Sequence, residues 1–189
     1  MNEVINNILD RRSVRNYTEE KVPKEILDQL LEVAVWSPNA GNRQRTRIVV
    51  SQDNALNTRL GKAQNVVYGQ FNSGKKIELS EELIQSTSRS GFYNAPTVIY
   101  LFAPDRFLFA EPDSYIMAHN ICLAAHSIGV DSCIISVATD YFFDEFGQEA
   151  LKKWDIPEDY HISAQVILGY RAGKYPAPKE RKYQAPLFV

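Results

Sequence analysis

Residues 115–128 read YIMAHNICLAAHSI, and this stretch decides the fold. Apolar side chains occupy nearly every face of the helix that it predicts, so we expect that helix to be buried all round. Asp113 is placed to cap its start and Gly129 to close its end. A chain of 189 residues has little material with which to cover such a helix on every side. A partner subunit would supply that cover, so we expect an intertwined homodimer.

The segments around this helix predict an α+β fold. The run TVIYLF at 97–102 is typical of a buried strand. Further strands are expected at 47–50, 133–137 and 163–168, and helices at 2–10, from Pro23 to Ala34, after Ser80 and at 141–153. Residues 53–90 are polar and punctuated by glycines. Because no regular βαβ alternation is present, we expect a central, mainly antiparallel sheet flanked by helices.

Length and composition indicate a single domain spanning residues 1–189. Hydrophobic residues make up 44% of the chain and charged residues 23%, as in ordinary globular proteins. A net charge of -2 and a pI near 5.9 argue against nucleic acid as a partner. The first residues are unlike a secretion signal and no run is long enough to cross a membrane, so we expect a cytoplasmic protein. Cys122 and Cys133 lack the spacing of metal ligands, so neither a zinc site nor a disulfide framework is expected.

A basic cluster follows the first predicted helix. It comprises Arg11, Arg12, Ser13 and Arg15. Guanidinium groups match phosphate geometry with two parallel hydrogen bonds, so this cluster suits an anion. Taken alone, the cluster is better explained as a solvated basic turn that pairs with surface acids.

Two further segments carry polar side chains suited to a ligand. In the loop 37–44, the amides of Asn39, Asn42 and Gln44 both donate and accept hydrogen bonds, as reading the edge of a heteroaromatic ring requires. The alternative for this loop is a helix cap. Near the C-terminus, Lys179, Arg181 and Lys182 form a second basic group, whose alternative is a frayed tail.

In their order along the chain, these segments resemble the nitroreductase family of FMN-dependent oxidoreductases. The resemblance runs from Arg11 to Arg181 and is carried by RRSVRNY, SPNAGNRQ, NAP before a strand, AAHSIGVDSC and LGYRAGKYPAPKERK. Each motif is weak by itself, and their common order is what makes the resemblance specific. It implies a homodimer with two FMN sites at the subunit interface.

The resemblance also implies a role for each motif. Arg11 and Ser13 match positions that bind the FMN phosphate, with Arg12 beside them, and Arg15 matches a basic residue facing the ribityl chain and the pyrimidine ring. Lys179 and Arg181 match phosphate ligands near the C-terminus. The loop that reaches the flavin from the other subunit is matched by Pro38, Asn39, Ala40 and Asn42, with Gln44 following. The strand end beside the flavin ring is matched by Ile134, Ile135 and Ser136.

The sequence departs from the family pattern at two places. Arg45 and Thr46 stand where Pro-Trp commonly follows the loop, and Ser136-Val137 stands where several members have Glu-Gly. The middle of the chain offers only candidates for further flavin contacts, namely Gln64, Lys75 and Lys76. Tyr68, Phe71, Phe92 and Tyr93 could line a substrate pocket or fill the core.

The implied function is electron transfer from NADH or NADPH through FMN to an electron-poor acceptor, such as a nitroaromatic or a quinone, by a ping-pong mechanism. The flavin would carry the chemistry, so no protein nucleophile is expected, and Arg15 would stabilise the reduced flavin. Three alternatives remain: a flavin-binding protein without turnover, a narrower flavin reaction such as reductive dehalogenation or flavin breakdown, and a domain that binds other phosphorylated ligands.

Overall fold

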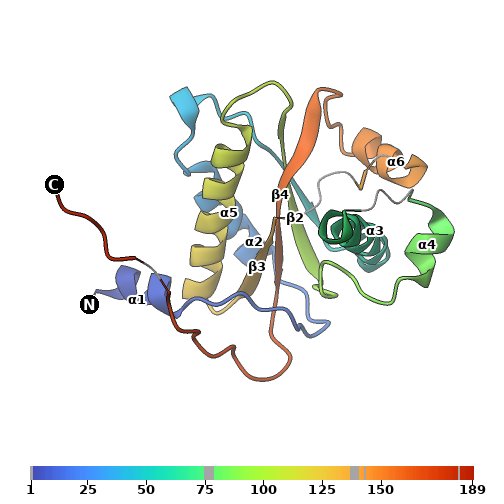
Figure 1. The fold of residues 1–189 in the computed structure, drawn as a ribbon. Coiled ribbons are helices and arrows are strands. Elements are labelled where there is room, and N and C mark those ends of the chain that lie inside the picture. The colour runs from blue at the N-terminus through green and yellow to red at the C-terminus, as the bar shows by residue number, and fades with distance from the viewer. Residues whose placement is uncertain (1, 75–78, 137–140, 143, 183) are drawn as a thin grey trace.

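A four-stranded antiparallel sheet divides the molecule into three layers (Figure 1). The computed structural model describes residues 2–74, 79–136, 141–142, 144–182 and 184–189, with only the backbone of 70–73. The strand order is β1-β2-β4-β3, with bounds Arg47–Ser51, Thr97–Pro104, Tyr160–Gly169 and Asp131–Ile135. All three pairings are antiparallel. The predicted α+β class and antiparallel sheet are therefore confirmed.

Helices cover both faces of the sheet, which is why the central strands are apolar throughout. β2 is buried along its whole length, and β4 from Ile162 onward. On one side lie α3 (Asn54–Ser73), α4 (Glu81–Ser86) and α6 (Glu145–Lys153); on the other lie α2 (Lys24–Val35) and α5 (Ala110–Ser127) (Figure 1). Each side holds its own hydrophobic core, and the sheet separates the two. No helix in the described part of the chain has the length and apolarity to span a membrane.

The first helix, α1 (Glu3–Asp10), confirms the expected amphipathic segment but leaves its apolar face uncovered. The Asn2 side chain caps it by accepting a hydrogen bond from the Ile5 amide. Val4, Ile5, Ile8 and Leu9 are between 42 and 67% exposed. Within one chain, α1 lies beside the outer flank of α5 (Figure 1), where the Asn7 amide donates to the Leu123 carbonyl at 2.9 Å.

The central helix differs from its prediction in two respects. α5 begins at Ala110, so Asp113 lies in its first turn and caps nothing there; its carboxylate instead accepts a hydrogen bond from the Ala40 amide at 3.0 Å. Nor is α5 buried all round within one chain, because Ile116 is 39% exposed and His119 is also exposed. Its predicted end is correct: Gly129 adopts a φ of 80° just past the helix.

The longest element that the sequence analysis does not predict is α3, which fills much of the polar 53–90 region. The Asp53 carboxylate caps it by accepting from the amides of Ala55 and Leu56, both at 3.0 Å. In the sequence Gly61 is typical of a break between elements, yet it lies within the helix. A Cβ there would lie 2.1 Å from Ser90 Oγ and 3.0 Å from the Phe92 ring, so this glycine permits close packing.

Smaller corrections concern element ends. α6 starts at Glu145 and not at 141, because the Asp144 side chain caps it, while Tyr141 and Phe142 enter the core. β3 ends at Ile135, so Ser136 lies beyond it, and residue 137 is outside the described part. α4 after Ser80 is confirmed, with the Ser80 side chain as its cap.

Candidate functional site

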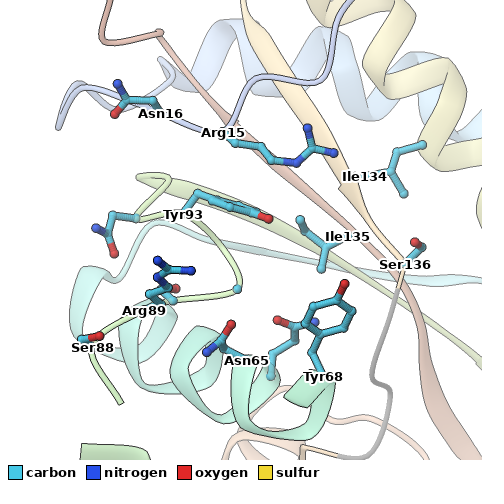
Figure 2. Close-up of a pocket in the computed structure, with 14 residues that line it drawn as sticks. Arg15, Asn16, Asn65, Tyr68, Ser88, Arg89, Tyr93, Ile134, Ile135 and Ser136 are labelled. Atoms are coloured by element: carbon cyan, nitrogen blue, oxygen red, sulfur yellow. The ribbon is translucent and has the colours of Figure 1, made fainter. Parts of the chain in front are cut away.

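The principal cavity lies between α3 and the end of β3 (Figure 2) and has a volume of about 620 Å³. Four segments line it: the stretch after α1, α3, the connection from α4 to β2, and the end of β3. Their lining residues are Arg15 and Asn16; Gln64, Asn65 and Tyr68; Ser88, Arg89, Ser90, Gly91, Tyr93 and Asn94; and Ile134, Ile135 and Ser136.

Backbone pairing along β3 sets the position of Arg15. Ser13 forms a parallel bridge with Ser132, and the Val14 amide donates to the Ser132 carbonyl at 3.0 Å. Val14 is buried, and its carbonyl accepts from the Tyr17 hydroxyl at 2.6 Å. This alternation turns the neighbouring Arg15 outward into the cavity, beside the last residues of β3.

A glycine contact sets the opposite wall. The Gly91 amide donates to the Gly61 carbonyl of α3 at 2.7 Å. A Cβ on Gly91 would lie 1.5 Å from Gln64 Oε1, so any larger residue would displace the Gln64 side chain from this wall. Next to it, Tyr93 and Asn94 adopt φ values of 52° and 55°, in the left-handed region that asparagine tolerates and tyrosine rarely adopts. The wall therefore combines close packing with backbone strain at the cavity edge.

The cavity is electropositive. Arg15 lies with its Cζ 5.9 Å from the centre of the Tyr93 ring, and Arg89 enters from the facing wall (Figure 2). No carboxylate is present among the described residues that line the cavity, and neither arginine forms an ion pair within the described part of the chain. Burial raises the pKa of the nearby Cys133 thiol, against the opposing influence of Arg15, so this sulfur is neutral.

The arginine cluster is held by Tyr175 at the C-terminal end of α5. The Arg12 amide donates to the Tyr175 hydroxyl at 2.7 Å, and that hydroxyl donates to the Asp10 carbonyl at 3.1 Å. The Tyr175 ring stacks on His126, with centres 5.9 Å apart. The Arg12 guanidinium bonds the carbonyls of Leu9 and Arg11, so it fixes the end of α1.

The loop 38–44 lies at the other end of α5. The Gln44 amide donates to Asn39 Oδ1 at 2.9 Å, and the Gln44 side chain donates to Asn42 Oδ1 at 3.0 Å. Ala40 is tied to Asp113, whereas the arginine cluster meets α5 at His126, which is 13 residues or about 20 Å further along the helix. Pro38, Asn39 and Gln44 line a separate cavity of about 130 Å³. Within one chain, no residue of this loop is among those that line the Arg15 cavity.

The C-terminal basic group is also separate within one chain. Lys179 and Arg181 are exposed, and neither lines the principal cavity. Figure 1 shows the C-terminal tail running past α1 and away from the sheet.

Comparison with known proteins places the chain. A family model described as the nitroreductase family matches residues 8–170. The chain belongs to the nitroreductase family. Over 53 residues it is 43% identical to the FMN reductase [NAD(P)H] of Bacillus subtilis, a match that covers 28% of this chain and 21% of that protein.

Solved nitroreductase structures share the fold over the full length. A nitroreductase with bound FMN from Bacteroides fragilis has a TM-score of 0.84 at 24% identity, with all of both chains covered. An FMN-dependent nitroreductase from Clostridium difficile has a TM-score of 0.80 at 25% identity, with 99% of both chains covered.

Sequence reasoning found one half of this nitroreductase cavity and missed the other. Arg15 and the 134–136 segment line it as expected, and so does Gln64; Lys75 and Lys76 lie outside the described residues. Tyr68 and Tyr93 belong to the cavity, whereas Phe92 belongs to the core and the side chain of Phe71 is not described. The missed residues are Asn16, Asn65, Ser88, Arg89, Ser90, Gly91 and Asn94. Capping of α3 by Asp53 was the signal that could have placed Asn65.

Proposed function

We propose that this chain is an FMN-dependent oxidoreductase that passes electrons from NADH or NADPH to an electron-poor acceptor of the nitroaromatic or quinone type. The observation that carries the proposal is the cavity at the end of β3, in which Arg15 and a strand terminus meet. Family membership and the FMN named for two of its structural relatives support it. Donor and acceptor would occupy the same open side of the cavity in turn.

The residues present fit FMN. A volume of about 620 Å³ is in the range of cofactor sites, and its walls carry amides, hydroxyls and cations. Arg12 Nε is buried and has no hydrogen-bond acceptor within the described residues, as expected where an anion completes the cluster. Arg11, Ser13, Lys179 and Arg181 would hold the phosphate.

Bound FMN would supply the hydride-accepting chemistry, and the protein would orient it. Arg15 would face the pyrimidine edge, where negative charge gathers on reduction, and would stabilise it electrostatically. The backbone at 134–136 would approach the ring from β3. No protein nucleophile is needed.

The complete site would require two chains. Within one chain the 38–44 loop lines a separate cavity and not the one that holds Arg15, so it would serve the cavity of a partner. The exposed apolar face of α1 and the exposed flank of α5 supply surface that a second copy would cover. We therefore propose a homodimer of single 189-residue domains, with Pro38, Asn39, Ala40, Asn42 and Gln44 reaching across.

An absorbance spectrum of the purified protein tests the proposal. FMN should bind stoichiometrically, and anaerobic addition of NADH or NADPH should bleach it; menadione or a nitroaromatic should then restore the colour. A protein that retains FMN but is not bleached would be a flavin-binding protein without turnover. Equal thermal stabilisation by other phosphorylated nucleotides would contradict an FMN site.

The phosphate assignment has its own test. Arg11→Ala and Arg181→Ala should each weaken FMN binding by roughly 10- to 100-fold, because each removes a charge-assisted hydrogen bond worth about 1.5–3 kcal/mol. Arg106→Ala, an exposed arginine beyond the end of β2, is the matched control and should bind FMN normally. Unchanged affinity in both test variants would overturn the assignment.

A further inference from the structure

Arg89 is a cation in the principal cavity that the flavin proposal leaves unused. It is exposed and lies in the connection from α4 to β2, facing the wall that carries Arg15. Figure 2 shows its guanidinium directed towards Tyr93 from the side opposite Arg15. Within the described part of the chain, Arg89 forms neither an ion pair nor a side-chain hydrogen bond.

The segment that carries Arg89 is fixed by contacts on its C-terminal side. The Gly91 amide bonds the Gly61 carbonyl at 2.7 Å, and the Tyr93 amide bonds the Ser90 carbonyl at 3.0 Å. Phe92 is 1% exposed and its ring contacts the rings of Tyr100 and Tyr141. The backbone at Arg89 is thereby anchored at the cavity rim, although its guanidinium stays accessible.

The charge balance of the cavity is unequal. Arg15 and Arg89 both enter it, while the other described lining residues are uncharged. Under the proposed function Arg15 faces the flavin, so one positive charge remains for whatever lies beside the flavin. An arginine without an acidic partner at the mouth of a cavity attracts and orients anions.

We infer that Arg89 selects substrates that carry an anionic group, a carboxylate, sulfonate or phosphate, on the part of the molecule that lies away from the reacting atoms. This inference rests on the proposed function and names the substrate class of the same site. The anion could belong to the electron acceptor or be the 2′-phosphate of NADPH. Both place the same chemistry on Arg89.

The test compares two nitroaromatics of similar size, 4-nitrobenzoate and 4-nitrobenzyl alcohol, on FMN-loaded enzyme. Arg89→Ala should raise KM for the carboxylate about tenfold, as expected for the loss of one solvent-exposed charge-assisted hydrogen bond, and leave its kcat unchanged. KM for the alcohol should stay within about twofold, because a neutral group gains little from the cation. Arg89→Lys should recover part of the difference, and Arg106→Ala should show none of the effect.

Two further measurements locate the anion without relying on turnover alone. Calorimetric titration with 4-nitrobenzoate should show about tenfold weaker binding to Arg89→Ala, and 0.5 M NaCl should weaken binding to the unaltered enzyme. If KM for NADPH rises while that for NADH does not, the phosphate of the donor is the anion recognised.

Three outcomes would overturn the inference. The first is an equal change in KM for the carboxylate and the alcohol. The second is an unchanged KM for both acceptors and for NADPH. The third is loss of FMN from Arg89→Ala, which would assign Arg89 to the cofactor. Turnover of the neutral alcohol by the unaltered enzyme reports on the proposed function separately, so the two failures are distinguishable.

Discussion

Tyr175 connects three parts of the chain through one side chain. Its hydroxyl accepts from the Arg12 amide and donates to the Asp10 carbonyl, while its ring stacks on His126 at an interplanar angle of 6°. The Arg171 guanidinium lies 5.2 Å from the ring centre and is itself paired with the buried Asp131. The position of the arginine cluster therefore depends on a residue 163 positions away from Arg12.

Tyr175→Phe should weaken FMN binding about fivefold without unfolding the protein. The substitution keeps the ring stacking but removes the two hydrogen bonds that order the backbone at the cluster, and one such bond is worth about 1 kcal/mol. Flavin fluorescence titration measures the change. Tyr170→Phe is the control, since its hydroxyl has no hydrogen bond among the described residues. Equal affinities of the two variants would contradict a positioning role.

Acid should destabilise the protein partly through His126. Burial lowers the pKa of His126 below its ordinary value of 6.5, with Arg11 and Arg12 adding to the effect against Asp10 and Asp131. The unfolded chain then binds the proton more readily, so stability is complete above about pH 6.5 and falls as the pH drops below it. His126→Gln should flatten the dependence of Tm on pH between 7 and 5.5. His119→Gln, on the exposed flank of the same helix, is the matched control for removing a histidine side chain.

At the residue scale, only part of the cavity could be predicted from the sequence. Arg15 was found because its charge and its place after a helix are both visible in one segment. Arg89 was missed because it reaches the cavity through the contact between Gly61 and Gly91, which joins residues 30 positions apart. Because this contact depends on two glycines that are far apart in the sequence, no local pattern predicts it.

At the element scale, α6 depends on close contact with the segment before it. The Asp144 side chain caps the helix by accepting from the Gly147 amide at 2.8 Å. A Cβ on Gly147 would lie 2.6 Å from Phe142 Cα and 2.7 Å from the Phe142 carbonyl carbon and oxygen. These are backbone atoms, so they cannot yield as the end of a side chain would.

Gly147→Ala should therefore destabilise the fold by about 1–3 kcal/mol, as overpacking does, despite the better helix propensity of alanine. Gly69→Ala is the matched control in α3: its Cβ would meet nothing within 4 Å, so the substitution should stabilise by roughly 0.5–1 kcal/mol. Chemical denaturation measures both. A neutral or stabilising Gly147→Ala would show that this contact relaxes.

The elements differ in how well the sequence predicts them. Long apolar runs predict β2 and α5. α3 was invisible because its glycines mimic breaks and its apolar residues are interspersed with polar ones, such as Asn57, that are buried and hydrogen-bonded. The buried face of α3 is determined by the sheet that it covers, and this tertiary contact cannot be predicted from the local sequence.

At the scale of the whole molecule, the exposed apolar surface is the feature that one chain does not explain. α1 presents four apolar side chains, and Trp36 at the end of α2 is 81% exposed. The apolar pattern of 115–128 predicts a dimer, and the exposed Ile116 marks the part of this helix that a partner would cover. The homodimer stays a prediction, because these apolar faces would be buried only by a second copy of the chain.

Ile5→Glu should shift the protein from dimer to monomer and reduce FMN retention with it. A charge placed on the apolar face of α1 would have to lose its hydration in the interface. Sedimentation velocity at micromolar concentration measures the state. Asn6→Glu, one residue along on the polar side of α1, should remain dimeric. If Ile5→Glu stays dimeric with FMN bound, α1 lies outside the interface.

The separation of Ala40 and Tyr175 at opposite ends of α5 has a consequence for mixtures of defective chains. A chain damaged in its loop, by Asn39→Ala, still owns a sound arginine cluster, and a chain damaged by Arg11→Ala still owns a sound loop. When both are co-folded in equal amounts, random pairing gives mixed dimers in which one site receives a sound half from each chain, so about a quarter of all sites should recover. Neither chain could be rescued in this way if each built its site alone.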